Sequence, residues 1–331
     1  MSQNSVVVAN GTGSAVRSAV NNALNSLVTN NSGTGAPSTT YAYMLWADTT
    51  NDLLKIRNAA NSAWITVGKL SQTNLGLSAI PRGALWGMTV SNNGTDATND
   101  LDVSAGSCAS DDATDANRVL LNPGVMTKQI DAVWAAGTAA GGRISSESLV
   151  NGTWYLYAFR RSGGTDDYCF SQSLTPTLPD GGTNKRLIFA MLRESAALIG
   201  IVHNGDRVDR KSPVLDVDVS NPGTSAVTRT LSVPTGLTVL AHMNVLVQAH
   251  NAGEYCYLSD LSQTDLAASD TAAPLATNGN NTAVNGDVAL PASIRTNTSG
   301  QIRSRFSASG GVNTLLKIAS TGWTYTRGRE N

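Results

Sequence analysis

The clearest strand signal in the chain is the segment Thr153-Trp154-Tyr155-Leu156-Tyr157-Ala158-Phe159-Arg160-Arg161. Successive side chains of a strand point to opposite faces of a sheet, so Trp154, Leu156 and Ala158 share one face. The other face carries Tyr155, Tyr157 and Phe159. Because both faces are apolar, the segment predicts a strand that is covered on both sides.

Shorter strand-like segments lie on either side of this strand and are separated by turn residues. In the middle of the chain they span residues 85–90, 101–106, 126–134 (a strand or a short helix), 186–193 and 197–203. Beyond Lys211-Ser212-Pro213, the best candidate for a domain boundary, they span residues 214–219, 226–233, 238–250, 255–259, 293–296, 302–307 and 315–319. Regularly spaced short strands with turn signals predict antiparallel β-sandwich or jelly-roll-like domains.

The composition favours a protein that works as part of an assembly. Charged residues make up 14% of the 331 residues, against roughly 25% in an ordinary soluble domain. Glycine (31 residues) and abundant serine, threonine and asparagine take their place, and these residues favour turns over long helices. A surface of amides and hydroxyls suits subunits that lie against one another.

The sequence also disfavours several kinds of protein. A net charge of −1 argues against nucleic-acid binding, which needs a basic stripe. No apolar run reaches the roughly 18 residues of a membrane-spanning helix, and residues 1–10 lack the features of a signal peptide. Cys108, Cys169 and Cys256 fit neither a disulfide framework nor a zinc site, so we expect buried, unreactive thiols in a chain assembled in a reducing cytoplasm.

The N-terminal segment partly matches a dinucleotide-binding fingerprint. Val6-Val7-Val8 precedes Gly11 and Gly13, and a helical pattern follows. However, the third glycine position holds Val16, and no acidic residue about 20 residues further on would hold a ribose. We therefore expect Thr12 or Ser14 to cap a helix, with the glycines shaping the turn.

A helix is expected from about residue 14 to residue 29. Val16, Val20, Ala23 and Leu27 are spaced by four, three and four residues, as in the seam of a coiled coil. Ala19, Leu24 and Val28 widen this seam. A helix of about 15 residues is marginal on its own, so we expect it to bind copies of itself or a socket in another protein. The alternative is a helix that packs on its own domain.

Residues 30–37 have the composition of a flexible linker. Short strands follow at residues 43–47, 53–57 and 64–67, separated by turn-rich spacers. This pattern predicts a three-stranded meander, with Trp46 and Trp64 in its small core.

This meander resembles a module that recurs near the N-terminus of bacteriophage tail fibre proteins. The matching segments are Pro37-Ser38-Thr39-Thr40-Tyr41, Leu45-Trp46-Ala47-Asp48, Leu54-Lys55-Ile56-Arg57-Asn58 and Trp64-Ile65-Thr66-Val67-Gly68. Segments that resemble the shaft or head of such fibres are 91–100, 127–134, 151–154, 175–179 and 185–188, and residues 321–329 resemble a common ending. The likeness covers most of the chain.

The resemblance implies a homotrimeric fibre protein of the virion, most simply a tail fibre, that is assembled in the host cytoplasm. The expected parts are an attachment and trimerisation segment (1–36), a β-meander (37–70), a β-rich middle domain (71–212) and a C-terminal β-sandwich (213–331). The N-terminus would join other tail or baseplate proteins through Val16, Val20, Ala23 and Leu27. Candidate contacts with a host glycan or protein are Asp270, Asn278 and Asn280, which lie in the long loop 269–285, and Trp323. For Trp323, a core residue and a platform for sugar stacking both stay open.

Two other functions stay open. One is a head-attached or purely structural fibre without a receptor. The other is a hydrolase of surface polysaccharide, which would need two carboxylates a few ångströms apart. Its candidate acids form the clusters Asp111-Asp112-Asp115, Asp166-Asp167 and Asp216-Asp218.

The chemistry of the remaining residues favours a protein that is not an enzyme. The histidines, His203, His242 and His250, neighbour no nucleophile motif, and no metal-binding motif is present. The loop from Asp96 to Asp102 could offer oxygen ligands to Ca²⁺, but a plain turn is the preferred interpretation. We therefore predict no catalytic residue, cofactor or metal, and we place Trp86, Trp134 and Trp154 in the core of the middle region.

Overall fold

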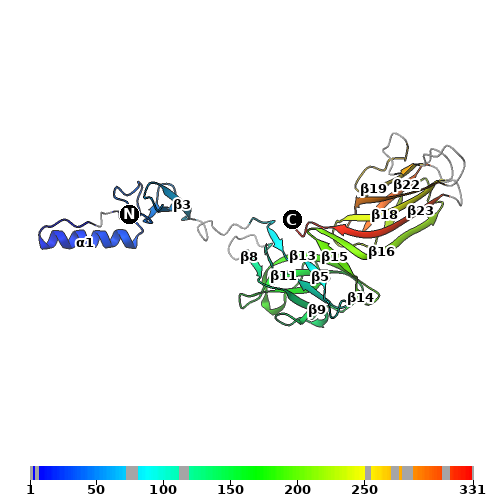
Figure 1. Ribbon diagram of the computed structural model, residues 1–331, viewed down its shortest axis with the longest axis horizontal. Helices are drawn as coiled ribbons and strands as arrows, with labels where there is room; N and C mark the ends of the chain where they lie inside the picture. Colours follow the sequence, from blue (N-terminus) through cyan, green and yellow to red (C-terminus); the bar gives the residue numbers. More distant parts are fainter. Residues whose placement is uncertain are drawn as a thin grey trace. The chain divides into compact units, whose positions relative to one another are not determined.

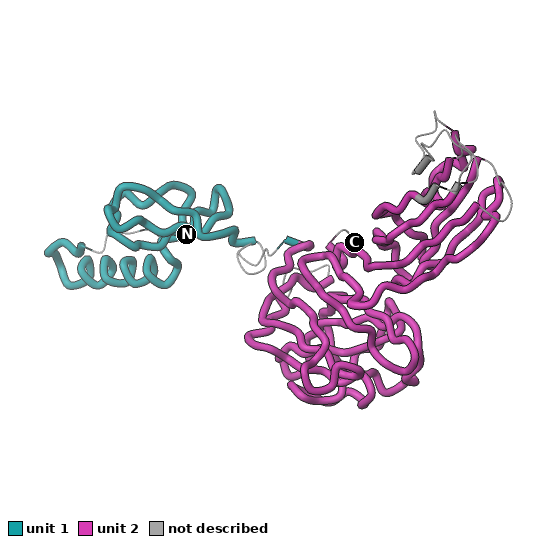
Figure 2. The backbone as a smooth tube through the Cα atoms, turned by 45° about the vertical axis from the view of Figure 1, so that its right-hand side comes forward, with its two compact units in different colours: residues 1–81, 112–118 teal, residues 82–111, 119–331 magenta. Residues whose placement is uncertain are grey.

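The computed structural model describes Gln3 and residues 7–71, 81–111, 119–249, 255–269, 276–277, 286–307 and 314–329. Within these residues there is one α-helix near the N-terminus, and nearly all other regular structure is β-strand, which confirms the predicted fold class (Figure 1). The chain forms two compact units (Figure 2). Unit 1 comprises Met1–Pro81 with Asp112–Arg118, and unit 2 comprises Arg82–Asp111 with Val119–Asn331.

The helix of unit 1, α1, spans Gly13–Val28. Thr12 is the N-cap, because its side-chain oxygen accepts a hydrogen bond from the backbone N–H of Ala15 at 3.3 Å. At the other end, the N–H of Thr29 donates to the carbonyl of Asn25. The helix and its cap are therefore where the sequence predicted them.

The meander of unit 1 consists of β1 (Leu45–Asp48), β2 (Leu53–Arg57) and β3 (Trp64–Lys69), all antiparallel. The rings of Trp46 and Trp64 lie 5.2 Å apart. Lys55 lies over the first ring and Arg57 over the second. These contacts confirm that the two tryptophans organise the meander.

The predicted flexible linker is wrong for residues 30–34, because these residues are bound along β1. The carbonyl of Asn30 accepts from Ala47, and the N–H of Gly33 donates back to the carbonyl of Ala47. The buried side chain of Asn31 also donates to the carbonyl of Leu45 at 2.9 Å. Composition alone suggested freedom, but a strand edge supplies partners for these backbone groups.

The first part of unit 2 contains an eight-stranded and a three-stranded sheet. The larger sheet has the order β14 (Ala197–Leu198), β13 (Thr183–Glu194), β11 (Gly152–Arg160), β12 (Asp166–Ser171), β10 (Ala140–Arg143), β9 (Met126–Val133), β6 (Asp100–Val103) and β5 (Val90–Asn92). The smaller sheet consists of β4 (Leu85–Gly87), β7 (Gly106–Ala109) and β8 (Val119–Asn122). A short 3-10 helix spans Pro179–Gly181.

Strand β11 is the strand that the sequence predicted to be covered on both sides. It lies between β12 and β13, and its residues from Trp154 to Phe159 are all buried. Both of its neighbours are antiparallel to it. By contrast, β10 runs parallel to β9 and β12, so the eight-stranded sheet is mixed.

The second part of unit 2 is a sandwich of two antiparallel sheets. One has the order β15 (Ile201–Asn204), β16 (Arg207–Ser220), β23 (Leu315–Thr324), β18 (Leu240–Ala249) and β21 (Gly286–Arg295). The other has the order β17 (Val227–Thr230), β22 (Gln301–Phe306), β19 (Tyr255–Ser259) and β20 (Ala276–Thr277). Figure 1 shows β16, β23 and β18 side by side in this region.

The division predicted at residue 212 falls inside β16, which continues without a break through Lys211-Ser212-Pro213. The pairing of β16 with β23 changes register between Asp209 and Val214, so an irregularity in one strand marks this point. A single cluster of buried apolar side chains extends through both parts of unit 2. It includes the predicted thiols Cys108, Cys169 and Cys256, which are buried and free.

Candidate functional site

The predicted assembly seam on α1 is divided between half-buried and exposed residues. Val16 and Ala23 are half-buried, and Ser26 is the residue of the helix that is fully buried. Val20, Leu24, Leu27 and Val28 are between 40% and 82% exposed. We call these four residues the helix surface.

The exposed side chains of the helix surface are apolar, so an apolar surface is the partner that matches them. Arg17 is the one charged residue of α1, and neither end of the helix carries a compensating charge in its terminal turn. Burying apolar side chains stabilises an association by about 25 cal/mol per Å² of surface removed from water. The chemistry of this surface therefore fits copies of itself or an apolar socket.

Trp323 is not a surface residue, and its prediction as a host contact is wrong. Its side chain is 1% exposed and points into the sandwich. Across the sheet it pairs with Val208 and Ala241, which are also buried. The alternation of β23 therefore places Trp323 in the core. The other candidates, Asp270, Asn278 and Asn280, lie outside the described residues.

Trp86 shows the opposite error, because the sequence predicted it in the core. Its side chain is 70% exposed on β4, in one cross-strand row with Ser107 and the exposed Leu121. Gly87 and Met88 both have positive φ, which marks an irregular backbone after Trp86. Met88 and Val90 are buried in spite of this break, whereas Trp86 departs from the usual burial of tryptophan, on which its prediction rested. The predicted core positions of Trp134, half-buried, and Trp154, fully buried, agree with the structure.

A groove of about 340 Å³ lies at the edge of the sandwich. It is lined by Leu258, Ser259, Asp260, Gln263, Ser293, Ile294 and Arg295. The ends of Arg295 and Asp260 form an ion pair at 2.6 Å. These residues lie in β19, in the turn after it and at the Arg295 end of β21, which is the end opposite to Gly286.

The described members of the acidic clusters are engaged with other groups. Asp166 pairs with Arg160 and accepts from the N–H of Leu121. Asp216 accepts from Ser232 and Ser320, and Asp218 pairs with Lys317. Asp111 lies near Lys185, whereas Asp112 and Asp115 lie outside the described residues. In the described residues, these carboxylates therefore form ion pairs and hydrogen bonds that stabilise the fold.

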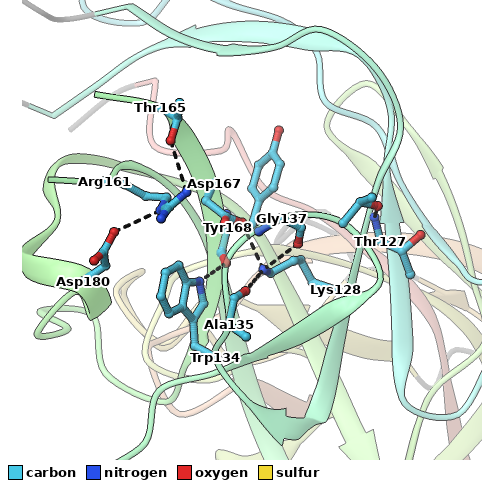
Figure 3. A network of polar contacts seen from close by, with 11 residues as sticks. Thr127, Lys128, Trp134, Ala135, Gly137, Arg161, Thr165, Asp167, Tyr168 and Asp180 are labelled. Atoms are coloured by element: carbon cyan, nitrogen blue, oxygen red, sulfur yellow. Dashed lines mark hydrogen bonds and ion pairs between the residues drawn. The ribbon is translucent and has the colours of Figure 1, made fainter. Parts of the chain in front are cut away.

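Asp167 belongs to a buried polar network around Lys128 (Figure 3). The Nζ of Lys128 lies 3.0 Å from Asp167 Oδ1 and donates to the carbonyls of Ala135 (2.7 Å) and Gly137 (3.1 Å). The N–H of Gly137 donates to Asp167 Oδ2. Trp134 lies beside the ammonium group and donates its ring N–H to the carbonyl of Tyr168. With all three protons of Lys128 used, the network fixes the segment between β9 and β10.

The side chain of Asp96 accepts hydrogen bonds from residues of its own loop. Asp96 Oδ1 accepts from the N–H groups of Thr98 and Asn99 and from the Thr98 hydroxyl. These hydrogen bonds lower the pKa of Asp96 and form the plain turn that the sequence favoured. In the described part of the chain, no group of three or more potential metal ligands is present.

Two histidines have hydrogen-bond partners that the sequence did not reveal. His242 lies 2.7 Å from the hydroxyl of Ser293 through Nδ1 and 2.7 Å from that of Thr324 through Nε2. All three residues lie on neighbouring strands of one sheet. His203 accepts from the N–H of Val90. His250 lies outside the described residues.

No protein-family model and no curated protein gives a significant match to this chain. Among the helices of the described residues, none is long and apolar enough to span a membrane.

Proposed function

We propose that the chain is a fibre-type structural protein of a bacteriophage particle that assembles as a homotrimer through its N-terminal unit. The exposed helix surface carries this proposal. A helix that presents Leu24 and Leu27 to water needs a partner, because a helix of this length gains most of its stability from packing. The alternative of a helix packed on its own domain is less favoured, since only Ser26 is fully buried.

The composition and the resemblance support the same proposal. Subunits that lie against one another need few surface charges, and only 14% of the residues are charged. Residues 37–68 carry the segments that resemble the N-terminal module of tail fibres, and they fold as a meander beside α1 in the same unit. Three copies would also give multivalent binding to a cell surface, which turns weak single contacts into avidity.

For host contact, we propose the groove lined by Asp260 and Arg295 and the exposed face around Trp86. The groove offers carboxylate, guanidinium, amide and hydroxyl groups, which are the partners of a polar ligand such as a glycan. The face around Trp86 offers an aromatic ring on which a sugar can stack. They replace Trp323, whose burial leaves no ring to stack on.

The attachment role is tested with the single substitution Leu27→Asn in the full chain. The matched control is Ser18→Asn, because nine residues are two and a half turns and place Ser18 on the opposite side of α1. We expect Leu27→Asn to reduce the number of copies in purified phage particles, measured by quantitative mass spectrometry, whereas Ser18→Asn leaves it unchanged. Equal incorporation of both variants would contradict the proposed role of the helix surface.

A second experiment separates a binding protein from a polysaccharide hydrolase. The full chain is incubated with host surface glycans, and reducing ends are measured over time. We expect binding without release, because the described carboxylates of the acidic clusters are held by cations and N–H groups. Release that is lost in a variant of one aspartate would contradict the proposal.

A further inference from the structure

Two buried arginines join the C-terminal segment of the chain to the first part of unit 2. Arg327 is 4% exposed and donates to the carbonyls of Ile188 (2.8 Å), Gly87 (3.3 Å) and Met88 (2.5 Å). Arg186 is 2% exposed and donates from Nε to the carbonyl of Arg327 at 2.9 Å. Each guanidinium is therefore held mainly by neutral carbonyl groups.

Donor groups beside these arginines are buried without an acceptor. Among the described residues, Nη2 of Arg186 has no hydrogen-bond partner. The Tyr325 oxygen lies near the backbone N–H of Gly328, and its hydroxyl donates to no acceptor. The Tyr325 hydroxyl and the Arg186 guanidinium lie on the same side of Gly328, both within 4 Å of the position of a Cβ there. Buried polar groups without a partner cost about 1–3 kcal/mol each.

The charges around these donors are not balanced. Arg186, Arg327 and Arg329 face Asp206 and Asp111. Asp206 is paired with Arg329, and its second oxygen has no hydrogen-bond partner. Asp111 is 4.0 Å from Arg186, is 43% exposed and also lies near Lys185. Two carboxylates therefore serve four cationic side chains.

From this geometry we infer a binding site for a small monovalent anion of the size of chloride, bound by Arg186 Nη2 and the hydroxyl of Tyr325. The ligand is an anion because every group assigned to it is a hydrogen-bond donor and the surrounding charge is positive. Arg327 contributes charge, since its own N–H groups already bind carbonyls. A cation would face Arg186 directly, which electrostatic repulsion disfavours.

The electrostatics of the neighbouring groups agree with this assignment. Burial, with Arg329 and Arg186 nearby, lowers the pKa of Arg327 to about 10. Burial also raises the pKa of Tyr325 to about 12, so its hydroxyl is a neutral donor at physiological pH. The guanidinium groups of Arg186 and Arg327 are buried and carry the same charge, and an anion beside them reduces their repulsion. It would thereby strengthen the junction that Arg327 makes with Gly87, Met88 and Ile188.

The site is tested by thermal unfolding of the full chain as chloride replaces gluconate at constant ionic strength. We expect the melting temperature to rise with chloride by about 2–4 °C, as for a ligand that binds only the folded state. In Tyr325→Phe, this rise should shrink, and the variant should be less stable than the natural chain in chloride. Tyr157→Phe is the matched control, because the Tyr157 hydroxyl is buried and already donates to the carbonyl of Ser173. It should lose stability equally in both salts.

Two results would overturn the inference. If Tyr325→Phe is as stable as the natural chain or more stable, the hydroxyl binds nothing and its removal relieves an unpaired group. If the variant is destabilised but chloride has no effect, the donors bind water only. A crystal grown in bromide checks the position directly, because the anomalous signal should lie beside Arg186 Nη2.

Discussion

Lys128 is a charged side chain with no exposed surface, and its partner Asp167 is equally buried. Burial lowers the pKa of Lys128, and the carboxylate of Asp167 opposes this effect. A buried ion pair contributes little net stability compared with apolar residues, but removal of one partner leaves an isolated buried charge. The pair therefore makes the fold sensitive to changes at either position alone.

We predict that Lys128→Met destabilises the protein by about 3–5 kcal/mol, because Asp167 loses its counter-ion. The double variant Lys128→Met with Asp167→Asn should recover a large part of this loss, since the charge is then removed from both sides. Chemical denaturation of the natural chain, both single variants and the double variant gives the coupling energy. If the single effects simply add, the pair is not the coupled unit described above.

His203 joins the two parts of unit 2 in its neutral form. Nε2 lies 2.8 Å from the carbonyl of Gly205, which can only accept, so Nε2 carries the proton and Nδ1 accepts from Val90. The ring also contacts Phe189 at 4.9 Å. Burial, with Arg327 nearby, lowers the pKa of His203 from 6.5 to about 4, against the weaker opposing effect of Asp206.

We predict an acid-sensitive junction with a defined pH range. Below pH 6.5 the unfolded chain binds a proton at His203 that the folded protein excludes until about pH 4, so stability falls as pH is lowered across this interval. The variant His203→Gln does not titrate there and should show a smaller loss of melting temperature between pH 7 and pH 4. An unchanged pH dependence in this variant would mean that other groups dominate the acid response.

At the scale of residues, the sequence did not always predict whether a side chain on a strand is buried or exposed. Trp46, Trp64, Trp154 and the three cysteines are where composition and alternation predicted them. Trp86, predicted in the core, is exposed beside an irregular backbone that no local pattern reveals. Trp323, for which a core position and a sugar-stacking position both stayed open, is buried. The hydrogen bonds of His203 and His242 join residues that lie far apart in the sequence.

Among the elements, the hairpin between β13 and β14 has an unusual turn. Ser195 and Ala196 both have positive φ (48° and 64°), and non-glycine residues in this conformation cost roughly 1–2 kcal/mol each. The sequence predicted a turn at residues 194–196. It did not predict this conformation, because two-residue turns of this kind usually contain Asn or Gly.

We therefore predict that Ala196→Gly stabilises the protein by about 1 kcal/mol, since glycine adopts positive φ without strain. The backbone N–H of Ala196, which donates to Asn151 Oδ1, is kept in this variant. Ala197→Gly in the adjacent strand is the control and should destabilise by about 0.5–1 kcal/mol. Thermal unfolding measures both changes, and destabilisation by Ala196→Gly would show that the turn is not strained.

The elements that the sequence predicted well are those with local signals. The helix, its Thr12 cap and the three strands of the meander follow from periodicity and turn residues. Local patterns did not predict that β10 runs parallel to its neighbours or that residues 30–34 bind along β1. Both depend on which edge a distant segment meets, and a window of sequence contains no such information.

At the scale of the whole molecule, two features of the chain point to assembly. Unit 1 presents apolar side chains on α1 that no described residue of the same unit buries. Unit 2 is larger and has a continuous apolar core. This division of roles fits the proposed fibre, in which the N-terminal unit holds copies together and the β-region extends from it.

The proposed trimer is tested most directly by the mass of the full chain in solution. Multi-angle light scattering at micromolar concentration should give three times the chain mass of 34.4 kDa. The substitution Leu27→Asn should shift this mass toward that of a single chain, because it places a polar group in the helix surface. A single-chain mass for the unaltered protein at that concentration would contradict the central proposal.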